Sequence, residues 1–179
     1  MLEKEKSLLV VTDVQGKLAQ LMFQKEILFK NIGILIDGCK ILGIPILWVE
    51  QYPQGLGPTV PEVASHLSGY EPLPKKCFSS LKNQRISERF EELGCSQVIM
   101  TGIEAHVCIY QTSLDLLAHG IEVHVVQDAV SSRTEENKTI GIGKIAYAGG
   151  YVTSVETVLF ELLNTAEGDA FKKILALIR

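Results

Sequence analysis

The chain has 179 residues, 46% hydrophobic and 21% charged, so a single domain spanning residues 1–179 with a substantial core is expected. Its net charge of −4, with no Lys/Arg cluster longer than a pair, argues against nucleic acid or an anionic membrane as partner. The N-terminus has no long apolar segment, and no apolar run approaches the ~20 residues that span a bilayer, so a soluble, cytoplasmic protein is predicted.

One pattern recurs along the chain: a helix-like stretch ends at a glycine, and a β-rich run begins within three residues. Glycine adopts the left-handed conformation that closes a helix without steric cost. The following runs are rich in Val and Ile, and several lack polar alternation, as expected for strands covered on both faces. The predicted strands lie near residues 7–12, 45–50, 97–102, 121–126 and 151–153, with a further candidate near 72–77, and the predicted helices near 27–42, 84–93, 106–118, 134–148, 155–164 and 168–178.

The alternation of helices with buried strands predicts an α/β fold. Right-handed crossovers then build a three-layer structure, a parallel sheet with helices on both faces. The stretch from Gln51 to Pro74 interrupts this alternation of helices and strands. It holds five of the six prolines and is predicted to be a long loop with one helical turn near 62–66. Ligands of open parallel sheets bind outside the carboxyl ends of the strands, so functional residues are expected just after each strand.

Polar side chains follow three of the predicted strands. Asp13 follows the first strand, where it is as well suited to cap a helix as to line a site. Glu50 and Tyr52 follow the second strand and would line a pocket, although solvated loop positions are commoner for either residue alone. Lys75 and Lys76 follow the candidate third strand, and only one of an adjacent extended pair can face a cleft. An isolated lysine is usually a solvated charge.

Cys108 lies where the strand 97–102 turns into a helix. A thiol in the first helical turn is close to free N–H groups and to the positive end of the helix dipole, which stabilise a thiolate. The same N–H groups can hold an oxyanion after the thiolate attacks a carbonyl or nitrile carbon. With a lysine to lower the thiol pKa and a carboxylate to carry the proton, Asp, Lys and Cys form a chemically complete set. The alternative interpretation is a small buried hydrophobe.

The other cysteines are weaker candidates for a nucleophile. Cys39 lies inside a helix, Cys95 lies at the wrong edge of the sheet, and Cys77, beside Lys76, is the second choice. No C-x-x-C pair is present, so free thiols are expected. The four histidines form no H-x-H or H-E-x-x-H pattern, and no phosphate-binding glycine motif follows a strand. No metal and no cofactor are therefore predicted.

At these residues the chain resembles the isochorismatase-like cysteine hydrolase superfamily, and most of all its branch of isochorismatase domain-containing proteins. The resemblance covers nearly the whole chain and is carried by VVTDVQGKL, WVEQYPQGLGPTVPE, KKCFSSL and GIEAHVCIYQTSLDLLAHGIEVHVVQDAVSSR. It implies a six-stranded parallel sheet in the order 3-2-1-4-5-6 and a catalytic triad of Asp13, Lys75 and Cys108. Lys75 is chosen because it lies four residues before Ser79, which is the family's spacing.

The resemblance also implies the surroundings of the triad. A cis peptide bond is expected between Ile103 and Glu104, and backbone N–H groups of Val107 and Cys108 are expected to form the oxyanion hole. The side chains expected around the substrate are Gln15, Tyr52, Phe78 and His106.

Departures from the family pattern narrow the function. Members that hydrolyse isochorismate typically lack the cysteine, so Cys108 argues against that substrate. Nicotinamidase relatives carry an Asp and His cluster for a metal just beyond the second strand, where this chain has Glu50 to Pro53, so neither a metal nor nicotinamide is supported. Ser80 and Leu81 stand where many relatives have Ala and Phe, which changes the expected pocket wall.

The leading hypothesis is a cofactor-free hydrolase that cleaves a C–N bond of a small amide-like substrate through a thioester on Cys108. A second hypothesis is a catalytically weak member that acts as a binding or interaction protein. A third is a redox-sensing thiol protein, which needs a resolving cysteine such as Cys77. The family is commonly dimeric to octameric, and the apolar composition agrees, so a homo-oligomer with a small-molecule substrate is expected.

Overall fold

The computed structural model describes residues 1–179 and contains one six-stranded sheet in which every neighbouring pair of strands is parallel. The order is β3-β2-β1-β4-β5-β6, so the predicted fold class and strand order are confirmed, including the third strand. The strands are β1 (Ser7–Thr12), β2 (Ile46–Gln51), β3 (Leu73–Lys75), β4 (Gln97–Ile103), β5 (Glu122–Ser131) and β6 (Tyr151–Thr153).

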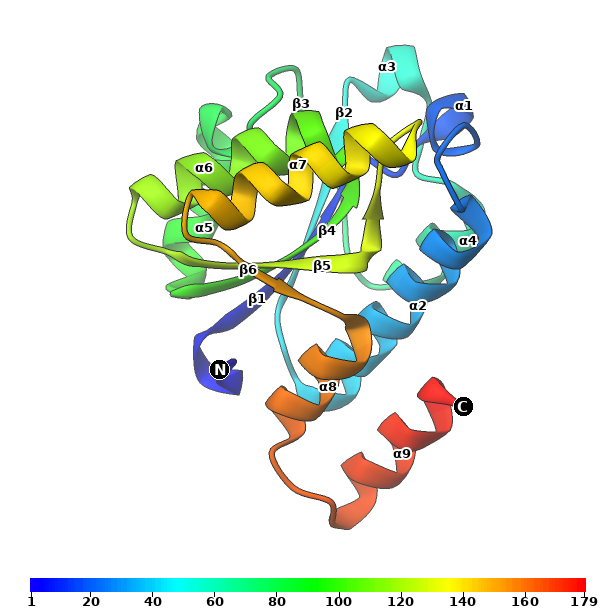
Figure 1. The fold of residues 1–179 in the computed structure, drawn as a ribbon, viewed down its shortest axis with the longest axis vertical. Helices are drawn as coiled ribbons and strands as arrows, with labels where there is room; N and C mark the ends of the chain where they lie inside the picture. The colour runs from blue at the N-terminus through cyan, green and yellow to red at the C-terminus, as the bar shows by residue number, and fades with distance from the viewer.

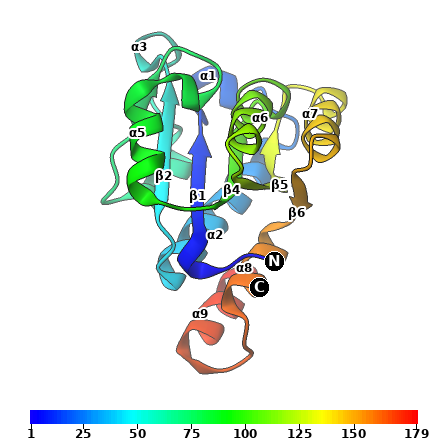
Figure 2. The same ribbon diagram turned by 90° about the vertical axis from the view of Figure 1, so that its left-hand side faces the viewer.

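Helices cover both faces of the sheet and complete the three layers (Figures 1 and 2). One face is covered by α2 (Lys25–Leu42) and α8 (Val155–Leu163), on which α9 (Gly168–Ile178) packs, and the other by α5 (Gln84–Leu93), α6 (Tyr110–Ala118) and α7 (Glu135–Tyr147). Shorter elements fill the connections: α1 (Gly16–Ala19), α3 (Pro53–Leu56), α4 (Pro61–Ala64), 3₁₀ turns at Lys4–Lys6, Ser65–Leu67 and Ser80–Lys82, and a π-helical turn at Ala105–Ile109. None of the helices combines the length and apolar character needed to cross a bilayer.

The central strands are buried along their whole length, which explains their missing polar alternation. In β1, Leu9 and Val11 pack towards α2, while Leu8 and Val10 pack towards α5 and α6. The sheet therefore separates two apolar clusters, and the helices that the sequence predicted supply the outer wall of each.

The strand predicted over 121–126 continues to Ser131, because the polar residues Gln127 and Asp128 form an irregularity within β5 and do not end it. The β4–β5 register shifts between Met100 and Gly102. Asp128 is satisfied there, since its Oδ1 accepts from the Val155 N–H at 2.9 Å. The extension carries the carboxyl end of β5 to the same edge as the ends of β1 and β4.

Cys39 on α2 is wholly buried, and burial raises the pKa of its thiol from 9.0 to about 12. The unfolded thiol keeps its ordinary pKa, so unfolding releases a proton between these values and the free energy of unfolding falls as the pH rises above 9. Between neutral pH and pH 10 we expect Cys39 to account for a loss of about 1.4 kcal/mol. Urea unfolding at both pH values measures this change in the free energy of unfolding. The Cys39→Ala variant should lose about 1.4 kcal/mol less than the wild type between the two pH values, and equal losses in the two proteins would contradict the assignment.

Candidate active site

The carboxyl ends of β1, β3 and β4 bring Asp13, Lys75 and Cys108 together at the upper edge of the sheet in Figure 1. Asp13 directly follows β1, Lys75 ends β3, and Cys108 lies in the π-helical turn after β4. The Lys75 Nζ is 2.7 Å from the Asp13 Oδ2. Asp13 is 3% exposed, Lys75 2% and Cys108 7%, so the three side chains share a site that solvent barely reaches.

Lys75 has a second partner that the sequence analysis missed. Its Nζ donates to the Gln51 Oε1 at 2.6 Å. Gln51 ends β2 and pairs directly with Lys75 in the parallel register, and such neighbours project to the same face of a sheet. The strand between β1 and β3 therefore supplies a side chain to the ammonium as it reaches across towards Asp13. A predicted β2–β3 register could have identified Gln51.

Cys108 rests as a thiol beside the ion pair. Burial is the main cause that raises the pKa of its thiol to about 12, the negative charge of Asp13 adds to it, and Lys75 opposes both. Burial also raises the pKa of Asp13, against the lowering effects of the Lys75 ammonium and of the neighbouring Cys108 thiol. Exclusion of solvent and a neighbouring carboxylate therefore outweigh the lowering effect of the Lys75 ammonium on the thiol pKa.

The backbone and side chain of Asp13 leave one oxygen available. Its φ of 57° is left-handed, and its N–H donates to the Val49 carbonyl at 3.0 Å, which fixes the end of β1 against β2. The carboxylate Oδ2 is held by Lys75, whereas Oδ1 is buried and has no hydrogen-bond partner. Oδ1 is thus the oxygen that can accept a proton from a neighbouring group.

The turn that carries Cys108 begins at a cis peptide bond between Ile103 and Glu104. The Val107 N–H donates to the Glu104 carbonyl at 3.0 Å, so the expectation that Val107 contributes to an oxyanion hole is not met in this arrangement. The N–H of Cys108 remains the candidate donor. The Glu104 side chain is largely buried and accepts from the Arg133 Nε at 3.0 Å, which ties the turn to the residues after β5.

Gly141 of α7 supports the same turn from behind. A Cβ at Gly141 would lie 2.5 Å from the carbonyl carbon and oxygen of Ala105 and 2.6 Å from the His106 nitrogen. These are backbone atoms, so they cannot move aside by changing a rotamer. The helix therefore fixes the turn by direct backbone contact, and only glycine fits there.

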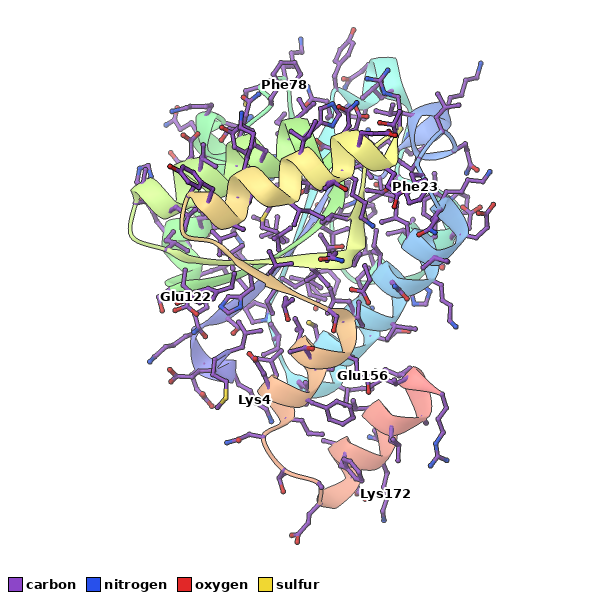
Figure 3. All side chains as sticks on the ribbon, viewed as in Figure 1. Lys4, Phe23, Phe78, Glu122, Glu156 and Lys172 are labelled. Carbon is purple, nitrogen blue, oxygen red and sulfur yellow. The ribbon has the colours of Figure 1, made fainter.

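The four residues expected around the substrate differ in their exposure. Gln15 is wholly buried, and its amide donates to the carbonyls of Gln51 at 3.1 Å and Gly57 at 2.7 Å, so it holds the loop in place, and its role in the substrate pocket stays a prediction. Tyr52 and Phe78 are 45% and 54% exposed, and Figure 3 shows Phe78 at the end of the molecule formed by the carboxyl ends of the strands. His106 is half-buried, with its Nδ1 2.9 Å from the Ser132 Oγ.

Glu50, the other strand-end residue noted in the sequence, fixes the long loop. Its Oε1 accepts from both the N–H and the hydroxyl of Thr59, each at 2.7 Å. The Trp48 indole N–H donates to the same hydroxyl at 2.9 Å. All four cysteines are free thiols, and no group of three or more His, Cys, Asp or Glu side chains is placed to hold a metal ion.

Comparisons with known proteins agree with this architecture. A family model described as the isochorismatase domain matches residues 7–157. The chain is 38% identical over 173 residues to isochorismatase domain-containing protein 2 of Danio rerio, covering 96% of this chain and 86% of the relative. It is 37% identical over 179 residues to the secreted isochorismatase effector Isc1 of Phytophthora sojae, covering 97% of this chain and 84% of that protein.

Two solved structures are similar over almost the whole chain. The MAR1 ribonuclease from Caenorhabditis elegans superposes with a TM-score of 0.91 at 35% identity, covering 99% of this chain and 91% of that one. The YcaC gene product of Escherichia coli, an octameric hydrolase of unknown specificity, gives a TM-score of 0.92 at 21% identity, covering 98% and 89%. At 21% identity, the similarity to YcaC shows a shared fold alone.

Proposed function

Because the chain belongs to the isochorismatase family, we propose that it is a cofactor-free cysteine hydrolase that cleaves a C–N bond of a small amide-like substrate. The observation that carries the proposal is the buried ion pair of Asp13 and Lys75, with the ammonium 2.7 Å from the carboxylate, beside a buried Cys108 whose pKa both groups shift. A nucleophile, a group that can accept its proton and a fixed positive charge share one enclosed site, and this is the arrangement that acyl transfer through a thioester requires.

The reaction begins from the neutral thiol. As the substrate carbonyl carbon meets the Cys108 sulfur, Asp13 accepts the thiol proton on its free oxygen and the C–S bond forms. The carbonyl electron pair moves to oxygen, where the N–H of Cys108 donates to it. The C–N bond then breaks as Asp13 returns the proton to the leaving amine. Lys75 stays cationic and stabilises the sulfur while it carries negative charge.

Water completes the cycle. It attacks the thioester carbonyl and gives a proton to Asp13, and the acid product leaves as the sulfur takes the proton back. The raised pKa of Asp13 suits the first transfer, because a more basic carboxylate accepts the thiol proton more readily. No step needs a metal ion or a redox partner.

A panel of small uncharged amides, carbamoyl compounds and nitriles tests the proposal. Single-turnover mixing with excess protein should release amine from at least one amide and leave an acyl group on the Cys108 peptide, as read by mass spectrometry. An acyl group found on another residue would assign the role of nucleophile to that residue. Failure of the whole panel to acylate the protein would overturn the proposal.

One observation favours a catalytically weak binding protein as the second candidate. The Cys108 thiol is 7% exposed and its pKa is raised to about 12, which slows attack. A compound in the panel that binds tightly without acylating the protein would support this candidate.

A cytoplasmic location stays a prediction, and one relative is a secreted effector. A homo-oligomer also stays a prediction. YcaC is octameric, and exposed apolar side chains on α7 and β6 offer an interface in this chain: Ile140, Tyr147, Tyr151 and Val152.

The C. elegans neighbour is named a ribonuclease, but the net charge of −4 disfavours RNA as a substrate of this chain. Adding a labelled RNA to the panel tests this.

A further inference from the structure

We infer that Gln51 is a positioning residue of the proposed site, which orients the Lys75 ammonium so that one N–H faces the Cys108 sulfur. The inference rests on the proposed function and adds to it a fourth side chain that acts through Lys75. Gln51 ends β2, half-buried beside the ion pair, and its Oε1 is 2.6 Å from the Lys75 Nζ.

The argument follows from the three donors of an ammonium group. One N–H of Lys75 is donated to the Asp13 Oδ2 at 2.7 Å and a second to the Gln51 Oε1 at 2.6 Å. With two directions fixed, the rotation of the ammonium about the Cε–Nζ bond is fixed as well. The third N–H is left for Cys108, whose thiol is in contact with Lys75.

Gln51 can fix the ammonium because it is itself held at both ends. Its Nε2 donates to the Lys76 carbonyl at 3.0 Å, which leaves only Oε1 to face Lys75. Its backbone N–H donates to the Gln15 Oε1 at 2.6 Å. A flipped amide would oppose its nitrogen to the Lys75 ammonium and its oxygen to a carbonyl, so the observed orientation is the one with complementary partners.

The chemistry of the amide also suits this role. An amide oxygen accepts a strong hydrogen bond from an ammonium but carries no net charge. A carboxylate in its place would compete with Asp13 for Lys75 and would raise the thiol pKa further by its charge. A neutral acceptor holds the lysine and leaves its positive charge to act on the sulfur.

The test measures how fast iodoacetamide alkylates Cys108, resolved by peptide mass spectrometry between pH 6 and pH 10. Below the thiol pKa this rate follows the fraction of thiolate. Gln51→Met keeps the length of the side chain and removes its acceptor, and we expect an alkylation rate about tenfold lower, equivalent to a thiol pKa about one unit higher. Gln54→Met, on the exposed surface of α3, is the matched control and should match the wild type. Gln51→Ala replaces the methionine variant if that variant fails to fold.

Two readouts separate positioning from a structural role. Cys77 directly follows Lys76, whose carbonyl Gln51 contacts. It is half-exposed and reports on distortion of this loop, and its alkylation rate should stay unchanged. In a Lys75→Met background, Gln51→Met should have no further effect on Cys108, because Gln51 acts through Lys75. An equal slowing of Cys77, or additive effects in the double variant, would overturn the inference.

The same series distinguishes the inference from the proposed function. If Lys75→Met slows Cys108 and Gln51→Met does not, Gln51 is no positioning residue and the proposed triad stands. If Lys75→Met itself leaves the alkylation rate of Cys108 unchanged, the role of Lys75 in the proposed function fails, and the inference about Gln51 fails with it.

Discussion

Cys108→Ala is expected to lower the hydrolysis of any amide that the protein turns over by about a thousandfold or more, because the bond-forming atom is gone. The acyl adduct detected in single turnover should disappear with it. The variant should still fold, since it loses one buried sulfur and keeps the Asp13–Lys75 ion pair. Amine release and thermal melting, measured on the same preparation, establish both points.

Cys77→Ala provides the matched control. Cys77 was the second choice for the nucleophile and is half-exposed on the loop after β3. Its replacement should leave amine release at the wild-type level. If Cys77→Ala abolished the reaction while Cys108→Ala retained it, the nucleophile would have to be reassigned.

Gly141→Ala is expected to disable the site from a distance. The added Cβ would lie 2.5 Å from backbone atoms of Ala105, so either α7 or the turn before Cys108 must shift. Overpacking of this kind costs about 1–3 kcal/mol or more. A displacement of the nucleophile near 1 Å costs on the order of a hundredfold in rate. We therefore expect a lower melting temperature together with a large loss of acylation at Cys108.

Gly143→Ala is the control on the same helix. No atom lies within 4 Å of a Cβ at Gly143, which is exposed, and alanine is favoured over glycine in a helix by up to about 1 kcal/mol. This variant should be at least as stable as the wild type and fully reactive. Equal behaviour of the two alanine variants would show that the contact with the turn does not fix Cys108.

The sequence predicted those parts of the fold that depend on local patterns. The continuous apolar run of β1 indicated a strand covered on both faces, and β1 is buried throughout. Gly43 and Gly94 end α2 and α5 with φ values of 75° and 60°, as expected for left-handed helix ends. The strand-end rule pointed to Asp13, to Cys108 and to one of the two adjacent lysines, and the family resemblance chose Lys75, which pairs with Asp13 at that edge.

What the sequence could not predict depends on contacts between distant segments. Gln51 was passed over because its role follows from the register of β2 with β3 and not from its residue type. Gln15 was expected near the substrate, but its side-chain amide donates a hydrogen bond to the Gly57 carbonyl in the loop after β2. For Cys108, the position at a helix start suggested a thiolate, whereas the pKa is decided by how far the surrounding elements exclude water.

Hydrogen peroxide reacts with the ionised form of a cysteine, and it must first reach the sulfur. The pKa of the Cys108 thiol is raised to about 12 and its side chain is buried, so little thiolate forms and peroxide hardly reaches it. Cys77, in contrast, is half-exposed. The protein should therefore keep its proposed nucleophile reduced during storage in air, with oxidative damage falling on dispensable thiols. The enclosure that raises the pKa of the thiol also preserves the sulfur between substrates.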